Sequence, residues 1–251
     1  MVHNLFMQVF KEEYKVRSFN VNLRGRVGLY TILNFVEDVG WRHGRKLGIK
    51  LGDDLSWIFT RQKLTMTEWP RMDQNVSLLT WLRPPLSETF LLRDYEIYLQ
   101  DKKIGEATSS FSAFNLKTRK LERQNWQPFS HLWSPEGSVQ LQPTKIPPVT
   151  SARSLAVFEV RNSDIDLNNH VNNTKYAQWI LDALPIALLK QGAELLGYEV
   201  NFISEARVGD VIEIQVAEEI KNEGSVTVTQ FQGHHKTEGK VMFTALLTTR
   251  E

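Results

Sequence analysis

The sequence predicts an α+β fold built from two similar halves, and three observations support this. The chain has 251 residues, 41% hydrophobic and 24% charged, which is enough apolar material for a sizeable core. Each half contains one amphipathic helix pattern followed by several strand patterns. Five of the nine prolines lie between residues 128 and 148, where neither periodicity is present.

In the first half, a strand is expected to start at "FNV", residues 19–21. A helix follows, because apolar residues recur at i, i+3, i+4, i+7 and i+10: Leu29, Ile32, Leu33, Val36 and Val39. Strands are expected in "TMTEWPRMDQNVSLLTWL" and on both sides of a turn at residues 101–103.

The second half repeats this order. A strand is expected at "FEV", residues 158–160, and a helix carries Tyr176, Trp179, Ile180 and Ala183 on one face before Pro185 interrupts it. Strands follow in "NFISEARVGDVIEIQV" and around a turn near residues 233–236.

Matching Phe19 with Phe158 and Glu68 with Glu205 gives similar shifts of 139 and 137 residues, which indicates a duplicated unit. A lone helix with one apolar face needs a sheet to cover it, and a curved antiparallel sheet wrapped round the helix does so. We therefore predict a double hotdog, with hotdog units at 1–130 and 151–251 and a proline-rich linker at 131–150. A coincidental likeness between two α+β domains is the alternative.

Composition excludes several classes of function. The net charge of +1 does not point to nucleic acid or to a membrane surface. The sequence contains no run of 18 apolar residues, so a transmembrane helix is not expected. The first residues lack the pattern of a secretory signal. Because the chain has no cysteine, disulfides, thiolate metal sites and thiol catalysis are excluded. We expect a cytoplasmic protein without a metal or cofactor.

The most informative segment is "SDIDLNNHVNN", residues 163–173, in which Asp166, Asn168 and His170 stand at i, i+2 and i+4. The asparagines favour an extended or looped segment, and Asn172 or Asn173 can cap a helix that starts near Thr174. A carboxylate, an amide and an imidazole beside a helix start can activate water and polarise a carbonyl. A polar capping loop without catalysis is the alternative interpretation.

The duplication bears on this choice. A shift of 139 residues places the three polar residues opposite Val27, Leu29 and Thr31, where the first half has no polar set. The motif is therefore not required by the fold, which favours a functional role.

The segment "SDIDLNNHVNNTKYAQWILDALP" resembles the signature of the acyl-acyl carrier protein thioesterases, which release fatty acids by cleaving an acyl thioester. The likeness extends over roughly residues 10–250, including "WIFTRQKLTMTEWPRMDQNVSLLTWL" and "AFNLKTRKLER". It implies that Asp166, Asn168 and His170 are catalytic, that Glu205 in "ISEARVGD" is the catalytic glutamate, and that the second unit carries the chemistry while the first shapes the pocket. The family has a cysteine after this glutamate, whereas this chain has Ala206, so water is the expected nucleophile.

The resemblance also implies acyl carrier protein as the substrate-bearing partner, an acidic protein in this family's setting. Two basic clusters are candidates for its docking surface: Arg42, Arg45, Lys46 and Lys50, and Lys117, Arg119, Lys120 and Arg123. A double hotdog can be a monomer, because it pairs two units within one chain, and a homodimer is the alternative.

Rival functions are an acyl-CoA thioesterase, a hotdog dehydratase and a non-enzymatic acyl-binding protein. The adjacent His234 and His235 suggest a metal site only weakly, because neighbouring residues rarely reach one ion. His43 is expected to face solvent, and Glu68 to have a structural role or to lie at the pocket rim.

Overall fold

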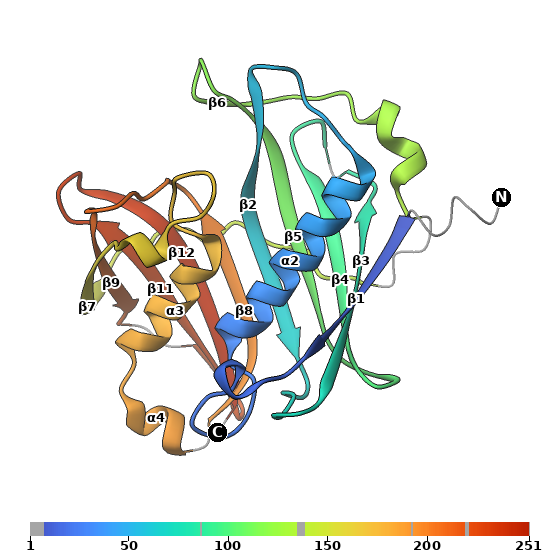
Figure 1. Ribbon diagram of the computed structural model, residues 1–251. Helices are drawn as coiled ribbons and strands as arrows, with labels where there is room; N and C mark the ends of the chain where they lie inside the picture. Colours follow the sequence, from blue (N-terminus) through green and yellow to red (C-terminus); the bar gives the residue numbers. More distant parts are fainter. Residues whose placement is uncertain (1–7, 86, 135–138, 192, 219–220, 251) are drawn as a thin grey trace. The chain divides into compact units, whose positions relative to one another are not determined.

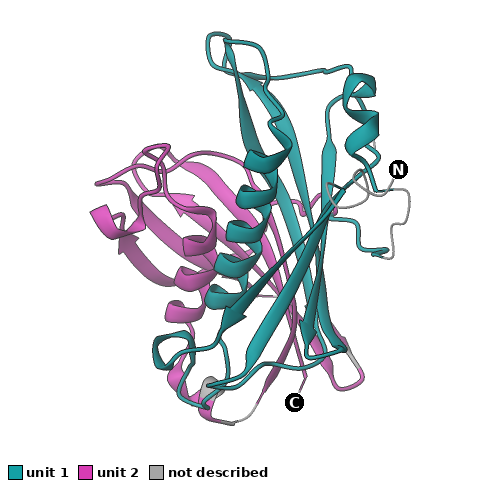
Figure 2. Ribbon diagram, turned by 45° about the vertical axis from the view of Figure 1, so that its right-hand side comes forward, with its two compact units in different colours: residues 1–143 teal, residues 144–251 magenta. Residues whose placement is uncertain are grey.

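The computed structural model describes residues 8–85, 87–134, 139–191, 193–218 and 221–250. The chain divides into two compact units, Met1–Pro143 (unit 1) and Thr144–Glu251 (unit 2) (Figure 2). The division falls within the proline-rich segment.

Unit 1 contains an antiparallel sheet in which neighbouring strands follow the order β1-β3-β4-β5-β2, with the short strand β6 paired to β5. The strands are β1 (Val9–Lys15), β2 (Leu55–Met66), β3 (Asn75–Arg83), β4 (Leu91–Leu99), β5 (Lys102–Asn115) and β6 (Lys120–Glu122).

Helix α2 (Leu29–Leu47) packs against this sheet (Figure 1). All five residues expected on its apolar face are buried, which confirms the periodicity argument. The helix ends at Gly48, whose φ of 63° suits a residue without a Cβ atom. Two short 3₁₀ helices, η1 (Ser18–Asn20) and η2 (Gln127–Leu132), complete the helical elements described in unit 1.

Unit 2 contains a second antiparallel sheet in the order β7-β9-β11-β12-β8, with β10 paired to β11. The strands are β7 (Ala152–Glu159), β8 (Glu194–Phe202), β9 (Val211–Ala217), β10 (Lys221–Glu223), β11 (Val226–His235) and β12 (Lys240–Arg250). The helices are η3 (Asn162–Asp164), α3 (Asn173–Ala183) and α4 (Ile186–Gln191). Helix α3 contacts β7 and β9, and Pro185 stands between α3 and α4, as the sequence predicts.

The two sheets repeat one topology, because β1, β3, β4, β5 and β2 correspond in order to β7, β9, β11, β12 and β8. Each unit is a hotdog, a helix laid on a curved antiparallel sheet, so the predicted double hotdog is confirmed (Figure 1). The strand expected at residues 19–21 is wrong: Phe19 lies in η1 and is 83% exposed. The turn expected at 233–236 is also misplaced, since β11 continues to His235.

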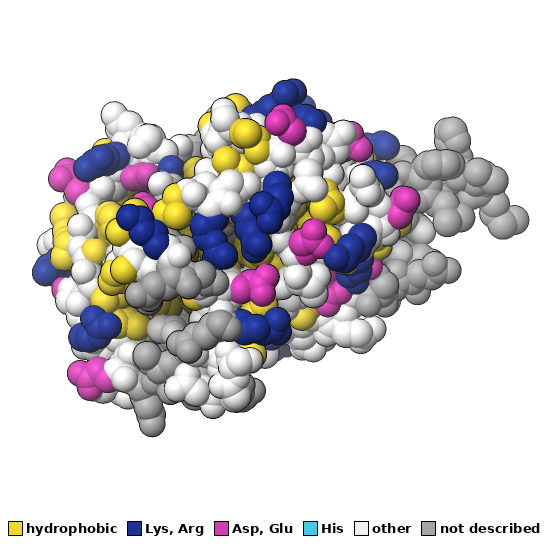
Figure 3. Space-filling view, turned by 90° about the horizontal axis from the view of Figure 1, so that it is seen from below, with side chains coloured by type: hydrophobic (Ala, Val, Ile, Leu, Met, Phe, Trp, Pro, Cys, Tyr) yellow, Lys and Arg dark blue, Asp and Glu magenta, His cyan; other side chains and the backbone are white. Residues whose placement is uncertain are grey.

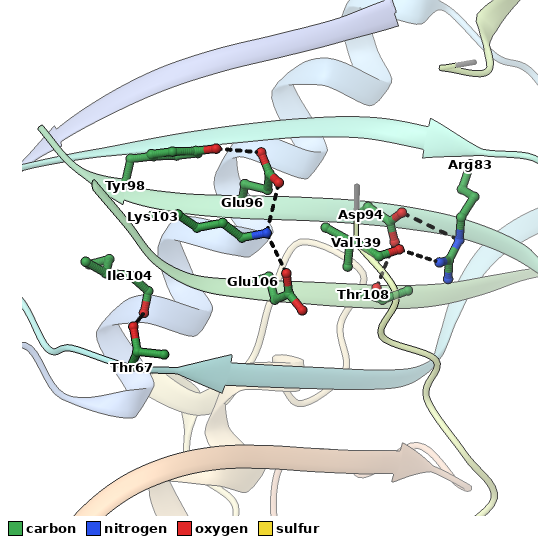
Figure 4. Close-up of polar contacts among 10 residues, drawn as sticks. All are labelled: Thr67, Arg83, Asp94, Glu96, Tyr98, Lys103, Ile104, Glu106, Thr108 and Val139. Carbon is green, nitrogen blue, oxygen red and sulfur yellow. Dashed lines mark hydrogen bonds and ion pairs between the residues drawn. The ribbon is translucent and has the colours of Figure 1, made fainter. Parts of the chain in front are cut away.

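The segment between the units is held by side chains of the sheets. Arg83 donates a hydrogen bond of 3.0 Å from Nη1 to the carbonyl oxygen of Val139 (Figure 4). Its Nη2 atom donates another of 3.0 Å to the carbonyl oxygen of Leu141. Glu199 accepts from the backbone and hydroxyl of Thr144 at 2.5 and 2.8 Å. These contacts satisfy backbone groups that a proline-rich segment cannot pair with itself.

None of the helices that the structure describes has the length and apolar character that crossing a membrane requires.

Candidate active site

The candidate site begins with a tight turn between η3 and α3. The backbone N–H of Asp166 donates to the carbonyl oxygen of His170 at 2.9 Å, and that of Asn169 donates to the carbonyl oxygen of Asp166 at 3.1 Å. Asn169 has a φ of 63°, which asparagine tolerates better than most residues. The looped alternative is therefore the correct one, and the three motif residues do not form an extended segment.

The carboxylate of Asp166 shapes this turn. Its Oδ1 atom accepts hydrogen bonds from the backbone N–H of Asn168 at 2.8 Å and from that of His170 at 3.4 Å. Its Oδ2 atom lies 3.4 Å from the side-chain amide nitrogen of Asn168. This contact pattern is an Asx turn, in which an Asp or Asn side chain replaces a backbone acceptor. Asp166 thus touches the backbone of His170, not its ring.

Helix α3 follows the turn immediately. Asn172 is its N-cap: Oδ1 accepts from the backbone N–H of Thr174 at 2.9 Å. The expected helix start near Thr174 is confirmed, and Asn172 is the capping residue of the two candidates. The cap fixes the direction in which the turn enters the helix.

Glu205 supplies the carboxylate that meets the imidazole. Its Oε2 atom lies 3.2 Å from Nε2 of His170, and both side chains are about one-third exposed, at 34% and 28%. Glu205 stands in the loop between β8 and β9. This loop is joined to the motif because the backbone N–H of Val171 donates to the carbonyl oxygen of Ala206 at 3.0 Å. A partly exposed His–Glu pair can exchange a proton with a substrate or with water.

The structure therefore brings the four predicted residues together in two contacts. His170 meets Glu205 through side chains, and Asp166 meets Asn168 through the turn. The amide of Asn168 is exposed beside this turn, where it can donate to a bound carbonyl.

Sequence reasoning missed Tyr176 as a neighbour of the site. Its place in the apolar pattern of α3 predicts only a core residue, and its side chain is 3% exposed. Burial raises the pKa of its phenol above the usual range, and the carboxylate of Glu205 adds to this rise. The backbone of Ala206 acts in the opposite direction and partly offsets this rise in the pKa. The phenol of Tyr176 thus lies close enough to the loop that carries Glu205 to feel its charge.

The pair formed by Asp210 and His235 was also missed. Nε2 of His235 lies 3.3 Å from Oδ1 of Asp210, while Nδ1 accepts from the backbone N–H of Glu238 at 3.2 Å. In the neutral ring this arrangement places the proton on Nε2, toward Asp210. Oδ2 of Asp210 accepts from the backbone N–H of Arg207 at 2.8 Å. The pair thus connects the Glu205 loop to the end of β11.

The expectation that His43 faces solvent is wrong. It is fully buried, and its Nδ1 lies 2.7 Å from Nη1 of Arg93. Among the described residues no cluster of three or more His, Cys, Asp or Glu side chains could hold a metal ion.

Unit 1 repeats the backbone of the candidate site. In its turn, Oδ1 of Asn22 accepts from the backbone N–H groups two and four residues later at 2.9 and 3.4 Å. The backbone N–H of Asn22 donates to the carbonyl of Arg26 at 2.8 Å, and Gly25 has a φ of 68° where unit 2 has Asn169. The two turns therefore form the same backbone hydrogen bonds at corresponding residues.

This repeat corrects the alignment made from the sequence. The counterparts of Asp166, Asn168 and His170 are not Val27, Leu29 and Thr31 but Asn22, Arg24 and Arg26, 144 positions earlier. The error arose from matching Phe19 with Phe158, which share only a local pattern of residues. The first half does carry a polar set here, so the turn belongs to the fold and only its side chains differ.

The counterpart of Glu205 also changes. The backbone N–H of Val27 donates to the carbonyl of Pro70 at 2.7 Å, as Val171 does to Ala206, so Trp69 corresponds to Glu205. Glu68 is one position off and lies 2.5 Å from Nζ of Lys102. Unit 1 consequently has arginine and tryptophan where unit 2 has the His–Glu pair.

Comparisons with known proteins agree with this fold. Residues 7–125 match the model of the acyl-ACP thioesterase N-terminal domain, and residues 149–245 match that of the C-terminal domain. The chain therefore belongs to the acyl-ACP thioesterase family.

Curated relatives are plant proteins. A chloroplastic acyl-[acyl-carrier-protein] hydrolase of Cuphea viscosissima is 26% identical over 88% of this chain and 58% of its own length. A chloroplastic palmitoyl-acyl carrier protein thioesterase of Gossypium hirsutum is 25% identical over 90% of this chain and 59% of its own length. The chain thus spans less than two thirds of the length of these relatives.

Solved structures share the fold along nearly the whole chain. An acyl-ACP thioesterase from Bacteroides thetaiotaomicron has a TM-score of 0.83 at 23% identity and covers 96% of this chain and 98% of its own. The 12:0-ACP thioesterase from Umbellularia californica has a TM-score of 0.79 at 18% identity and covers 96% and 94%.

Proposed function

We propose that the protein hydrolyses the thioester of fatty acyl-acyl carrier protein and releases the free fatty acid, with unit 2 carrying the chemistry and unit 1 shaping the acyl pocket. The observation that carries this proposal is the 3.2 Å contact between His170 and Glu205 at the family's motif. The family match supports the substrate class.

Water is the nucleophile in this proposal, because the chain contains no cysteine. The His170–Glu205 pair takes one proton from a bound water molecule, and the oxygen adds to the thioester carbonyl carbon. The resulting oxyanion accepts a hydrogen bond from the amide of Asn168. When the carbon–sulfur bond breaks, the pair returns the proton to the departing thiolate.

Asp166 has a positioning role in this scheme. Its carboxylate binds backbone N–H groups of the turn and thereby places Asn168 and His170. The carboxylate that contacts the imidazole of His170 belongs to Glu205 instead.

The decisive experiment measures fatty acid release from acyl-carrier substrates by the unaltered protein, His170→Ala and Glu205→Gln. We expect each substitution to reduce turnover by about 100-fold or more, since general acid–base catalysis contributes about 10² to 10⁴. Near-normal turnover by both variants would refute the assignment.

Parallel measurements separate the rivals. Faster turnover of acyl-CoA than of the acyl-carrier substrate would identify an acyl-CoA thioesterase. A non-enzymatic acyl-binding protein would bind acyl chains without turnover, and His170→Ala would leave that binding unchanged. A cytoplasmic location and a monomeric or homodimeric state remain predictions, and gel filtration with light scattering tests the latter.

A further inference from the structure

Two neighbouring loops of unit 1 expose an unusual combination of basic and apolar side chains. The first loop joins β1 to α2, and the second precedes β3; they meet where Arg26 and Arg71 form an antiparallel bridge. We define the loop surface by six residues: Arg17, Phe19, Leu23, Arg26, Arg71 and Met72. Figure 3 shows the structure from below, and the visible face carries several Lys and Arg side chains among hydrophobic and acidic ones.

The arginines of the loop surface are not neutralised. Across the part of the chain that the structure describes, no carboxylate forms an ion pair with Arg17, Arg26 or Arg71. Arg26 and Arg71 are also direct neighbours across the bridge, and like charges in this position destabilise a fold. Two adjacent arginines that lower the stability of the fold and have no carboxylate partner among the described residues indicate an anionic partner outside the chain.

The apolar members of the loop surface are exposed to an extent that folding does not require. Phe19 is 83% exposed, Leu23 54% and Met72 48%. Aromatic residues, methionine and arginine are the residues enriched at protein–protein interfaces, whereas a phosphate site needs no exposed phenylalanine. The combination therefore fits a protein surface that presents carboxylates around apolar side chains.

Each of the two basic clusters expected from the sequence contains a residue that is paired with carboxylates of unit 1. Arg42 lies 3.0 Å from carboxylate oxygens of both Glu12 and Asp38. Lys117 lies 2.7 Å from Asp54. The positive charges of Arg42 and Lys117 are partly neutralised in this way, so these two side chains attract another acidic molecule less strongly.

The duplication explains how the loop surface can exist. Its first loop contains the turn that corresponds to the catalytic turn of unit 2, with the same hydrogen bonds but arginines at the positions of Asn168 and His170. Because that turn holds its shape through the Asn22 side chain, the side chain of Arg26 is not needed to form the turn.

We propose that the loop surface docks the acidic face of the acyl carrier protein, an inference that rests on the proposed function. The net charge of the chain is only +1, so attraction of an acidic carrier must come from such a local surface. The loop surface acts on carrier recognition and leaves the chemistry at His170 and Glu205 unchanged.

The test compares two substrates that carry the same acyl group, one on the carrier protein and one on N-acetylcysteamine. For Arg26→Glu/Arg71→Glu we expect the KM for the carrier substrate to rise by about 10-fold or more and that for the small thioester to stay unchanged, because lost charge complementarity slows association. Phe19→Ser should raise the same KM. The matched control Lys11→Glu/Arg153→Glu makes an equal change of charge at exposed basic residues outside the loop surface and outside both basic clusters, and should alter neither KM.

Equal effects on both substrates, or an effect of the control as large as that of the variant, would overturn the proposal. If the double variant does not fold, Arg17→Gln and Arg71→Gln measured separately, together with the dependence of the KM on salt, decide the question. Without turnover by the unaltered protein, the proposed function fails, and the docking is then tested by titration with a carrier that bears a non-hydrolysable acyl amide. Binding of that carrier unaffected by Arg26→Glu/Arg71→Glu would contradict the docking itself.

Discussion

Asn22 and Asp166 make the same hydrogen bonds in the two units: the Oδ1 atom of each accepts from the backbone N–H groups two and four residues later, at 2.9 and 3.4 Å for Asn22 and at 2.8 and 3.4 Å for Asp166. The chain thus shows that an amide shapes this turn as well as a carboxylate does. The negative charge of Asp166 is not needed for the geometry.

Asp166→Asn is therefore expected to keep fatty acid release within about threefold of normal. Asp166→Ala should lose about 10-fold to 30-fold, because two hydrogen bonds of about 1 kcal/mol each disappear from the turn. Steady-state kinetics of the two variants make the comparison. An equal loss in both would mean that the charge itself contributes to the reaction.

His235→Gln is expected to reduce kcat by about 10-fold, as for a lost interaction of about 1.4 kcal/mol, with the KM nearly unchanged. The reason is that His235 lies 3.3 Å from Asp210, which ends the loop carrying Glu205. His234→Gln, the same change at the preceding residue, is the control. A kcat loss in the control as large as in His235→Gln would indicate a general effect on β11.

Asn172→Ala should lower the free energy of unfolding by about 1 kcal/mol, the usual cost of removing an N-cap side chain. The Oδ1 atom of Asn172 accepts from the backbone N–H of Thr174, and alanine cannot replace it. Urea denaturation measures the change, with Asn173→Ala as the matched variant one position inside the helix. Equal destabilisation by both would argue against the cap.

Asp94 gives unit 1 a pH-dependent stability. Burial raises the pKa of its carboxyl from 3.8 to about 6, although Thr108 donates a 2.7 Å hydrogen bond to Oδ1 and Arg83 lies 3.5 Å away (Figure 4). The folded state therefore holds this proton more tightly than the unfolded state does. The stability that the protonated group contributes is complete below about pH 4 and is lost as the pH rises through about 6.

The matched variant is Asp94→Asn, which cannot titrate. Between about pH 4 and pH 7 the free energy of unfolding of the unaltered protein should fall relative to that of Asp94→Asn by up to about 3 kcal/mol. Chemical denaturation at several pH values provides the measurement. A difference that does not change with pH would contradict the raised pKa.

The sequence allowed prediction of the elements that depend on periodicity. The helix face of α2 follows from apolar spacing, and Pro185 and Asn172 mark helix ends through their own chemistry. The motif also located His170 and Glu205, which lie in contact although 35 positions separate them.

Other features could not be derived because they depend on tertiary contacts. The alignment of the two halves that the sequence suggests is off by five residues at the motif. The similar residues around Phe19 and Phe158 carry no information about hydrogen bonding. Tyr176 and His235 were read as a core residue and a turn residue. Their contacts with the Glu205 loop come from strands and a helix that sequence spacing does not bring together.

The full burial of Ala206 has a further consequence. Its Cβ atom is enclosed within unit 2. The thiol of a cysteine at this position would therefore be enclosed by protein and shielded from oxidants and alkylating reagents. The side chain at position 206 therefore contributes to packing, whereas the neighbouring Glu205 is partly exposed to the solvent.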